Sequence, residues 1–304
     1  MDRIFHALMM PSLKCFQRDA RTESMKILPD RNSILKSFIY CSGSILEPVI
    51  VSIKGTNMYS FTEKFKKSSF VSLISVFAAF NVICDSLMSL PLPFSGVWYS
   101  WVFIATPISG ILLGPYAGFL SSFIGVMVGH SMVFRGSEEF LFTFGAPIGA
   151  MISALLFRGR WKEVLVYYLV LLGAFFVTPV AWQLPLWGMW DVFFAFGCLL
   201  MVIVAMQKWK NIWNTRASTN LLYILALSAF IGLEADVLFR IFIFVPCQTY
   251  QSIYGFNVLD LQYIWGMGAI ETPIKAALST LITTIMGPPI IMAVRKMGLT
   301  LVKD

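Results

Sequence analysis

Eight apolar runs follow one another between residues 68 and 297, and they constrain the fold of this chain more than any motif does. Only 13% of the 304 residues are charged, against about 25% in an average soluble domain. A bilayer supplies apolar surroundings for such runs, and a helix satisfies its own backbone hydrogen bonds there. The sequence therefore predicts an all-helical membrane protein with about eight transmembrane helices. Their expected ranges are 68–88, 100–114, 116–134, 139–157, 164–182, 190–207, 219–241 and 267–294.

Basic residues fall on alternate sides of these ranges. The loops on one side contain a single basic residue, Arg135; these loops are 89–99, 135–138, 183–189 and 242–266. Because cytoplasmic loops carry an excess of lysine and arginine, both termini are predicted to be cytoplasmic, in a multi-pass protein of the plasma membrane. This clustering also accounts for the net charge of +7 without nucleic-acid binding. The residues on the basic side are Lys64, Lys66, Lys67, Arg158, Arg160, Lys162, Lys208, Lys210, Arg216, Arg295, Lys296 and Lys303.

The N-terminal residues 1–67 differ from the rest in composition. They hold eleven of the 23 lysines and arginines, and their apolar run is too interrupted to span a bilayer. Two interpretations stay open: a poorly ordered cytoplasmic tail, or a reading frame that truly starts at Met58. The helical bundle is expected over residues 68–297, and residues 298–304 are expected to form a short cytoplasmic tail.

Five charged residues lie inside the last two apolar runs, where a charge costs at least about 2.5–3.5 kcal/mol unless it faces protein or water. Asp236 with Arg240, and Glu271 with Lys275, have the i,i+4 spacing that lets one helix neutralise its own charges. Glu234 has no such partner and lies about 200° around the helix from Asp236. It must pair with another helix, hold a proton or meet a ligand. Glu234 is therefore the first candidate for a substrate contact.

Acidic residues gather in the outer half of the predicted bundle. A cavity on that side would favour a cationic or amine-bearing ligand, although simple orientation bias gives the same pattern. Only Arg135, Arg240 and Lys275 accompany the acids there. The acids are Asp85, Glu138, Glu139, Asp191, Glu234, Asp236, Asp260 and Glu271.

Further substrate-contact candidates lie near the outer ends of the runs: Asp85, His130, Trp98 and Trp101. Trp98 belongs to the apolar, proline-rich loop 89–99, which is either an interfacial belt segment or a lid over an outward cavity.

Motifs for enzymatic chemistry are missing from the sequence. The five cysteines lack metal-ligand spacing and the apolar runs hold a single histidine, so no metal or other cofactor is predicted. There is no nucleophile elbow and no Walker A motif. We therefore predict no catalytic residues and no ATP hydrolysis by this chain.

Small residues recur at four-residue spacing and predict close helix packing. The motifs are Gly125-x3-Gly129, Gly145-x3-Gly149, Ser75-x3-Ala79 and Ala150-x3-Ala154. At Gly114-Pro115-Tyr116-Ala117-Gly118, glycine and proline together are expected to end one helix and start the next.

These motifs resemble the substrate-binding S components of energy-coupling factor (ECF) vitamin transporters. In that family a Gly-Pro-x-x-Gly turn joins the second and third helices, as at Gly114, Pro115 and Gly118. The run 76–80 resembles the small-residue first helix that docks a coupling subunit, which implies docking through Ser75, Ala78 and Ala79. The run 144–149, with the basic residues at 158–160, resembles the fourth helix and its cytoplasmic loop.

The resemblance covers residues 68–160, and 219–297 more loosely. The family has six helices where eight are predicted here, so ranges 164–182 and 190–207 are expected to be an insertion. His130 stands where many members carry an acidic residue.

The resemblance implies a subunit that captures a vitamin-like molecule in an outward cavity gated by loop 89–99. Glu234, Asp236, Arg240, Glu271 and Lys275 would line or brace the site, and a coupling subunit with two ATPases would supply the energy.

Three other functions remain open. One is a stand-alone secondary transporter with Glu234 or Glu271 as a proton carrier, although no inverted repeat is detected. The others are an intramembrane enzyme that uses these two carboxylates, and a structural subunit.

Overall fold

The computed structural model describes residues 67–87, 100–133, 139–208 and 218–296, and every regular element in these ranges is a helix. Residues 1–66 of the predicted tail 1–67, the whole predicted tail 298–304, and loop 89–99 with Trp98 lie outside the described residues. From Leu73 onward the described chain belongs to one compact unit.

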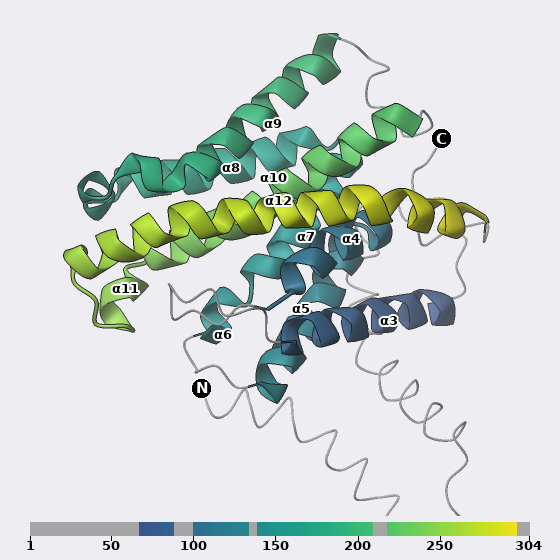
Figure 1. Ribbon diagram of the computed structural model, residues 1–304, viewed down its shortest axis with the longest axis horizontal. Coiled ribbons are helices and arrows are strands. Elements are labelled where there is room, and N and C mark those ends of the chain that lie inside the picture. The colour runs from purple at the N-terminus through teal and green to yellow at the C-terminus, as the bar shows by residue number, and fades with distance from the viewer. Residues whose placement is uncertain (1–66, 88–99, 134–138, 209–217, 297–304) are drawn as a thin grey trace, which may run out of the picture. The chain divides into compact units, whose positions relative to one another are not determined.

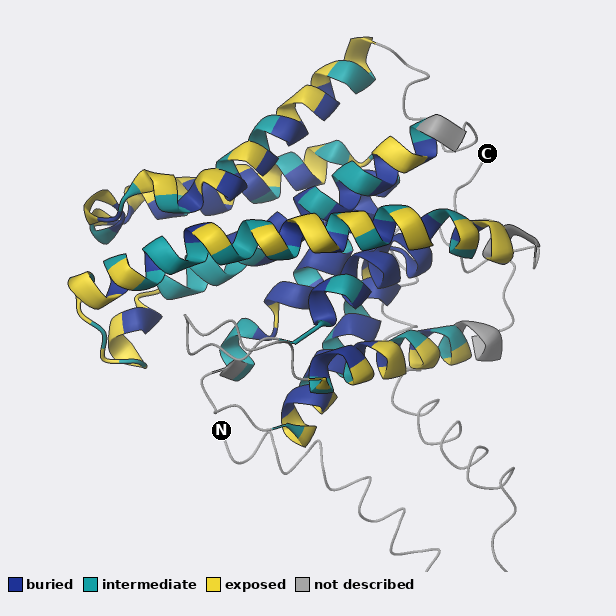
Figure 2. Ribbon diagram, viewed as in Figure 1, coloured by how far each residue is buried: buried dark blue, intermediate teal, exposed yellow. Residues whose placement is uncertain are grey.

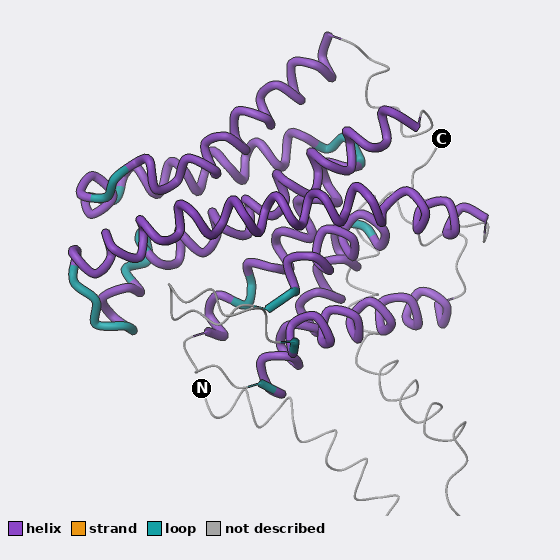
Figure 3. The backbone as a smooth tube through the Cα atoms, viewed as in Figure 1, coloured by secondary structure: helices purple, strands orange, loops and turns teal. Residues whose placement is uncertain are grey.

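Each of the eight predicted ranges falls on a helix or on a pair of successive helices, and short loops join most of them (Figures 1 and 3). The elements in chain order are α3 (Lys67–Ser86), α4 (Val102–Leu113), α5 (Pro115–Met132), α6 (Glu139–Phe142), α7 (Gly145–Phe157), α8 (Trp161–Val177), the 3-10 helices η2 (Pro179–Gln183) and η3 (Leu186–Met189), α9 (Trp190–Lys208), α10 (Ser218–Phe244), α11 (Thr249–Ser252) and α12 (Val258–Lys296).

Four helical segments among the described residues are long and apolar enough to cross a membrane: Phe140–Phe157, Leu186–Lys208, Asn220–Phe244 and Val258–Ala293. The apolar helices Val71–Ser86 and Val102–Leu113 are shorter. This finding supports a membrane-embedded protein in contact with a lipid bilayer. The total of eight spans and the orientation of the termini stay predictions.

The outer surface of the described helices is apolar. On α12 the side chains of Ile270, Ile274, Leu281 and Ile285 form one exposed stripe (Figure 2). Trp182, Trp187 and Trp190 are exposed where α8 gives way to α9. Exposed apolar stripes suit lipid tails, and tryptophans gather at membrane interfaces.

Two predicted boundaries are wrong, for local reasons. Helix α8 stops at Val177 rather than at residue 182, because Pro179 cannot continue it and starts η2 instead. Residues 258–266 were predicted as loop but form the first turns of α12. There Asn257 Oδ1 accepts the backbone N–H of Leu259 (2.8 Å) and Asp260 (3.0 Å), while the Asp260 carboxylate accepts the N–H of Asn257 (3.0 Å). This reciprocal cap starts the helix before the apolar run begins.

Helices α7 and α10 make the most extensive contact between any two helices of the described bundle, and glycines bring them together. A Cβ added to Gly149 would lie 2.9 Å from the Gly232 carbonyl oxygen, and one added to Gly232 would overlap Ser153. Helices α4 and α5 pack on α7, and α12 packs on α10. Similarly, a Cβ on Gly125 would lie 2.8 Å from the Ala78 carbonyl of α3. The close packing predicted from the glycine motifs is therefore confirmed at these contacts.

The turn predicted between α4 and α5 is also confirmed. Gly114 adopts φ +95°, and Pro115 is the first residue of α5. A side chain at Gly114 would also overlap the Arg158 guanidinium, which lies over the turn. Burial, together with the neighbouring Arg160, lowers the pKa of Arg158 to about 10. Arg158 nevertheless stays charged near neutral pH, beside the carbonyl end of α4.

Substitution at this turn should be costly. We expect Gly114→Ala to lower the melting temperature of the detergent-solubilised protein by about 5 °C, because alanine is strained at positive φ and collides with Arg158. Gly197→Ala is the matched control, since a Cβ at Gly197 in α9 meets nothing within 4 Å. Equal melting temperatures for the two variants would contradict this account of the turn.

Candidate functional site

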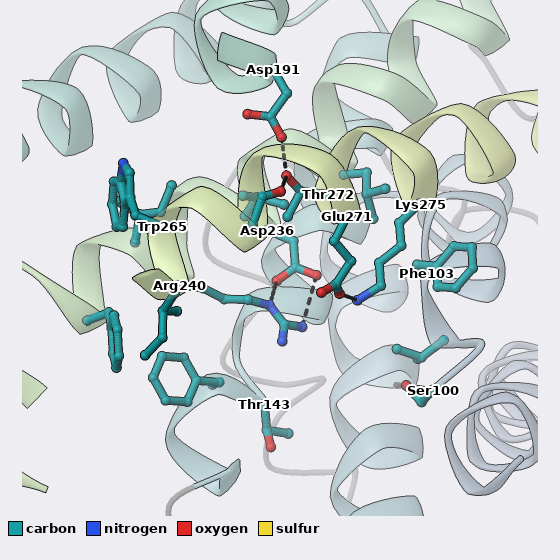
Figure 4. Close-up of a pocket in the computed structure, with 18 of the residues that line it drawn as sticks. Ser100, Phe103, Thr143, Asp191, Asp236, Arg240, Trp265, Glu271, Thr272 and Lys275 are labelled. Atoms are coloured by element: carbon teal, nitrogen blue, oxygen red, sulfur yellow. Dashed lines mark hydrogen bonds and ion pairs between the residues drawn. The ribbon is translucent and has the colours of Figure 1, made fainter. Parts of the chain in front are cut away.

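A cavity of about 500 Å³ lies at one end of the bundle, and Figure 4 shows the side chains around it. Helices α3, α5 and α10 contribute residues near their C-terminal ends, and α4, α9 and α12 contribute residues from their first halves. These positions meet at one level of the bundle. A volume of this size suits a small organic molecule.

Two ion pairs line the cavity, each within one helix. On α10, Arg240 Nε donates to Asp236 Oδ1 (2.7 Å) and Arg240 Nη2 donates to Asp236 Oδ2 (3.2 Å). On α12, Lys275 Nζ lies 2.5 Å from Glu271 Oε1. The two pairs face the same space in Figure 4. The i,i+4 pairs predicted from the sequence are confirmed.

Two further carboxylates reach the cavity from other helices. Asp85 of α3 is fully buried, and its Oδ2 lies 2.8 Å from His130 Nδ1 of α5. Asp191, at the start of α9, accepts a hydrogen bond from the Thr272 hydroxyl of α12 and another from the Val192 N–H (2.9 Å). The cavity thus holds four carboxylates against two basic side chains, Arg240 and Lys275, besides His130, which pairs with Asp85. Its electrostatic potential favours a positively charged group.

Aromatic rings form the wall beside Arg240. Phe244 packs against Phe142, Tyr254 and Phe256, with ring centroids 6.0, 5.7 and 6.4 Å apart, and all four rings line the cavity. This wall offers an apolar surface and ring faces that attract cations.

The indole of Trp265 is a second element of the wall. It is buried and stacked on Phe175, with ring centroids 5.7 Å apart. Its Nε1 has no hydrogen-bond partner among the described residues, although the side chain lines the cavity. A buried N–H is normally paired, because leaving it unpaired costs about 1–3 kcal/mol. The position is suited to an acceptor atom of a bound molecule.

The structure gathers six of the nine predicted substrate contacts on the cavity wall: Asp85, His130, Asp236, Arg240, Glu271 and Lys275. Trp101 is not among the lining residues but stacks on Phe103, which is, with ring centroids 5.8 Å apart.

Glu234, the first candidate from sequence, is also absent from the wall. It points into the protein and is fully buried. Neither of its carboxylate oxygens has a hydrogen-bond partner among the described residues. The tyrosines of α8 nearby bond backbone instead: Tyr168 donates to the Ile231 carbonyl and Tyr167 to the Ala235 carbonyl, each at 2.7 Å.

The three residues expected to dock a coupling subunit differ in their exposure. Ser75 and Ala79 are exposed on α3, but Ala78 is buried, with its carbonyl against Gly125 of α5. Ala78 therefore serves packing inside the bundle.

Sequence reasoning missed several residues of the site. Asp191 stood out as an outer acid, but nothing in the sequence joined it to Thr272, 81 positions away. Trp265 and the aromatic wall had no local signal, because aromatic residues are frequent throughout this chain.

Comparisons with family models, curated proteins and solved structures find no match for this chain. Among the described residues no group of histidine, cysteine and acidic side chains is arranged to hold a metal ion.

A double-mutant cycle on the α12 pair tests its contribution to stability. Glu271→Gln or Lys275→Met alone should lower the free energy of unfolding by about 2 kcal/mol, because each leaves a largely buried charge without its counter-ion. The double variant should recover most of this loss. Reversible unfolding in mixed micelles gives the free energy of unfolding of the wild type, the two single variants and the double variant. Additive losses in the double variant would show that the pair does not act as a unit.

Proposed function

We propose that this protein is the membrane-embedded, substrate-binding subunit of a transporter and captures a small amine-bearing molecule in the cavity. The observation that carries the proposal is the excess of carboxylates over cations on the wall of a cavity of about 500 Å³. A bound ammonium group would face Asp191 and the neighbouring acids. Charge pairing of this kind offsets the cost of taking a cation out of water.

Other wall residues narrow the ligand class. Trp265 Nε1 offers a buried donor without a partner among the described residues, which suits a carbonyl, carboxylate or ring-nitrogen acceptor. Arg240 and Lys275 also suit an acidic group, and the Phe244 wall suits an apolar or aromatic body. The favoured substrate carries an amine and an acceptor on a compact, partly apolar frame, as vitamin-like molecules do.

We further propose that the protein works as an S component of an ECF-type importer. The glycine-proline turn before α5 and the glycine-mediated contacts of α3, α5 and α7 support this assignment. Ser75 and Ala79 are small and exposed on α3, as a docking surface for a transmembrane coupling subunit requires. ATP hydrolysis would take place on separate ATPase subunits, at the plasma membrane, with both termini of this chain in the cytoplasm.

Glu234 favours a second candidate, a stand-alone proton-coupled transporter. A carboxylate that is fully buried without a hydrogen-bond partner among the described residues carries a high desolvation cost when ionised. Binding a proton removes that cost, so proton binding and release there can drive a conformational change. Because Glu234 does not line the cavity, it would act without touching the substrate.

The ligand class is tested with paired compounds. We expect amine-bearing vitamins and amino acids to raise the melting temperature of the purified protein, and their N-acetylated forms to have no effect. Asp191→Asn keeps the Thr272 hydrogen bond but removes the charge. The variant should therefore need at least a tenfold higher ligand concentration for the same rise in melting temperature. Glu163→Gln, on the exposed start of α8, is the matched control. Equal shifts from the N-acetylated compounds would refute an amine-binding cavity.

The energy source is tested by affinity purification from native membranes, followed by mass spectrometry. An S component should bring a coupling subunit and ATPases with it, and Glu234→Gln should then leave uptake unchanged. A stand-alone transporter should purify alone. Reconstituted in liposomes, it should take up substrate under a proton gradient, and Glu234→Gln should abolish that uptake while the binding shift remains.

A further inference from the structure

A second cavity, of about 450 Å³, lies between α9 and α10 and is almost entirely apolar. Its walls come from one face of each helix at spacings of three and four residues. They consist of Cys198, Met201, Val202 and Ala205 on α9, and Asn220, Tyr223, Ile224 and Leu227 on α10. The two helices separate toward the ends that Lys208 and Ser218 mark (Figure 1), which leaves the space between them open.

The cavity is a groove that opens on the outer surface of the helix pair. Cys198, Val202 and Ile224 form a buried floor, whereas Met201 is 63% and Tyr223 is 66% exposed. Helices α9 and α10 both belong to segments long and apolar enough to cross a membrane. In a bilayer an apolar groove of this kind faces acyl chains, not water.

One end of the groove carries the polar groups. Counting along α9, Ala205 and Lys208 follow Met201 by four and seven residues, so Lys208 lies on the groove face at the end of the helix. Asn220 faces this end from the first turn of α10. A cation and an amide at the mouth of an apolar groove complement a phosphate attached to acyl chains.

We propose that this groove binds a phospholipid with an anionic headgroup. One acyl chain lies along Val202 and Ile224, and the phosphate group lies at Lys208 and Asn220. The lipid completes the packing of α9 on α10 where the two helices separate. This site is distinct from the substrate cavity, and the proposal depends on membrane embedding rather than on the transport function.

Native mass spectrometry of the full-length protein in mild detergent tests the site, with phosphatidylglycerol and phosphatidylcholine of identical acyl chains as probes. We expect phosphatidylglycerol to be retained at least fivefold over phosphatidylcholine. Ala205→Phe, which fills the groove, should reduce the retention of both lipids at least fivefold. Ala205→Leu is a smaller addition that serves the same purpose if the phenylalanine variant does not fold.

Charge variants separate headgroup recognition from chain binding. Lys208→Gln should abolish the preference for phosphatidylglycerol and leave the retention of phosphatidylcholine unchanged. Lys162→Gln, another exposed lysine predicted on the same side, is the matched control and should keep the preference. Equal retention of the two lipids by the wild type, or undiminished retention by both Ala205 variants, would overturn the proposal.

Discussion

The contact between α7 and α10 is the constraint on which the rest of the bundle depends. Gly149 and Gly232 let the two backbones meet, and a side chain at either position would enter the other helix. A Cβ on Gly145 would overlap the Asp236 carboxylate, so the same close approach seats the Asp236–Arg240 ion pair against α7. Van der Waals packing of small residues supplies the attraction between membrane helices that the hydrophobic effect supplies in water. The site therefore rests on glycines as much as on charges.

The acids around this contact differ in the partners that neutralise them. Arg240 and Lys275 neutralise acids on their own helices, while Asp85 and Asp191 find partners on α5 and α12. Paired groups of this kind can lie inside a bilayer because each carries its counter-ion or hydrogen-bond partner with it. Glu234 is the exception among the acids described here, since its two oxygens lack hydrogen bonds within the described residues. Asp85, Asp191, Asp236 and Glu271 thus lie on the cavity wall, where they suit a ligand, whereas the buried Glu234 suits a bound proton.

The two cavities differ in ways that suit different molecules. The larger is lined by four carboxylates, two cations and an aromatic wall, and it lies near the exposed tryptophans between α8 and α9. The smaller is apolar and opens beside exposed side chains, with Ala205 and Asn220 lining it toward the Lys208 end of α9. The walls of the larger cavity suit a polar solute, and those of the smaller cavity suit an acyl chain. Helix α9 takes part in both, with Asp191 at one end and Ala205 near the other.

The sequence by itself determined the helices, the apolar ranges and the pairs within one helix, such as Asp236 with Arg240. These features depend on spacing along the chain, which a 3.6-residue period converts directly into geometry. It also determined the turn at Gly114, because positive φ and a following proline are local requirements. Helix ends were less certain where a cap such as Asn257 outweighed hydropathy.

Only the tertiary structure decided which helices meet. It brought Asp85 to His130 across 45 positions and Thr272 to Asp191 across 81, and it turned Glu234 away from the cavity while Asp236, two residues on, faces it. It also left Trp265 on the cavity wall without a hydrogen-bond partner among the described residues. Packing between membrane helices is set by the shapes of many small residues acting together, and no local pattern in the chain encodes that outcome.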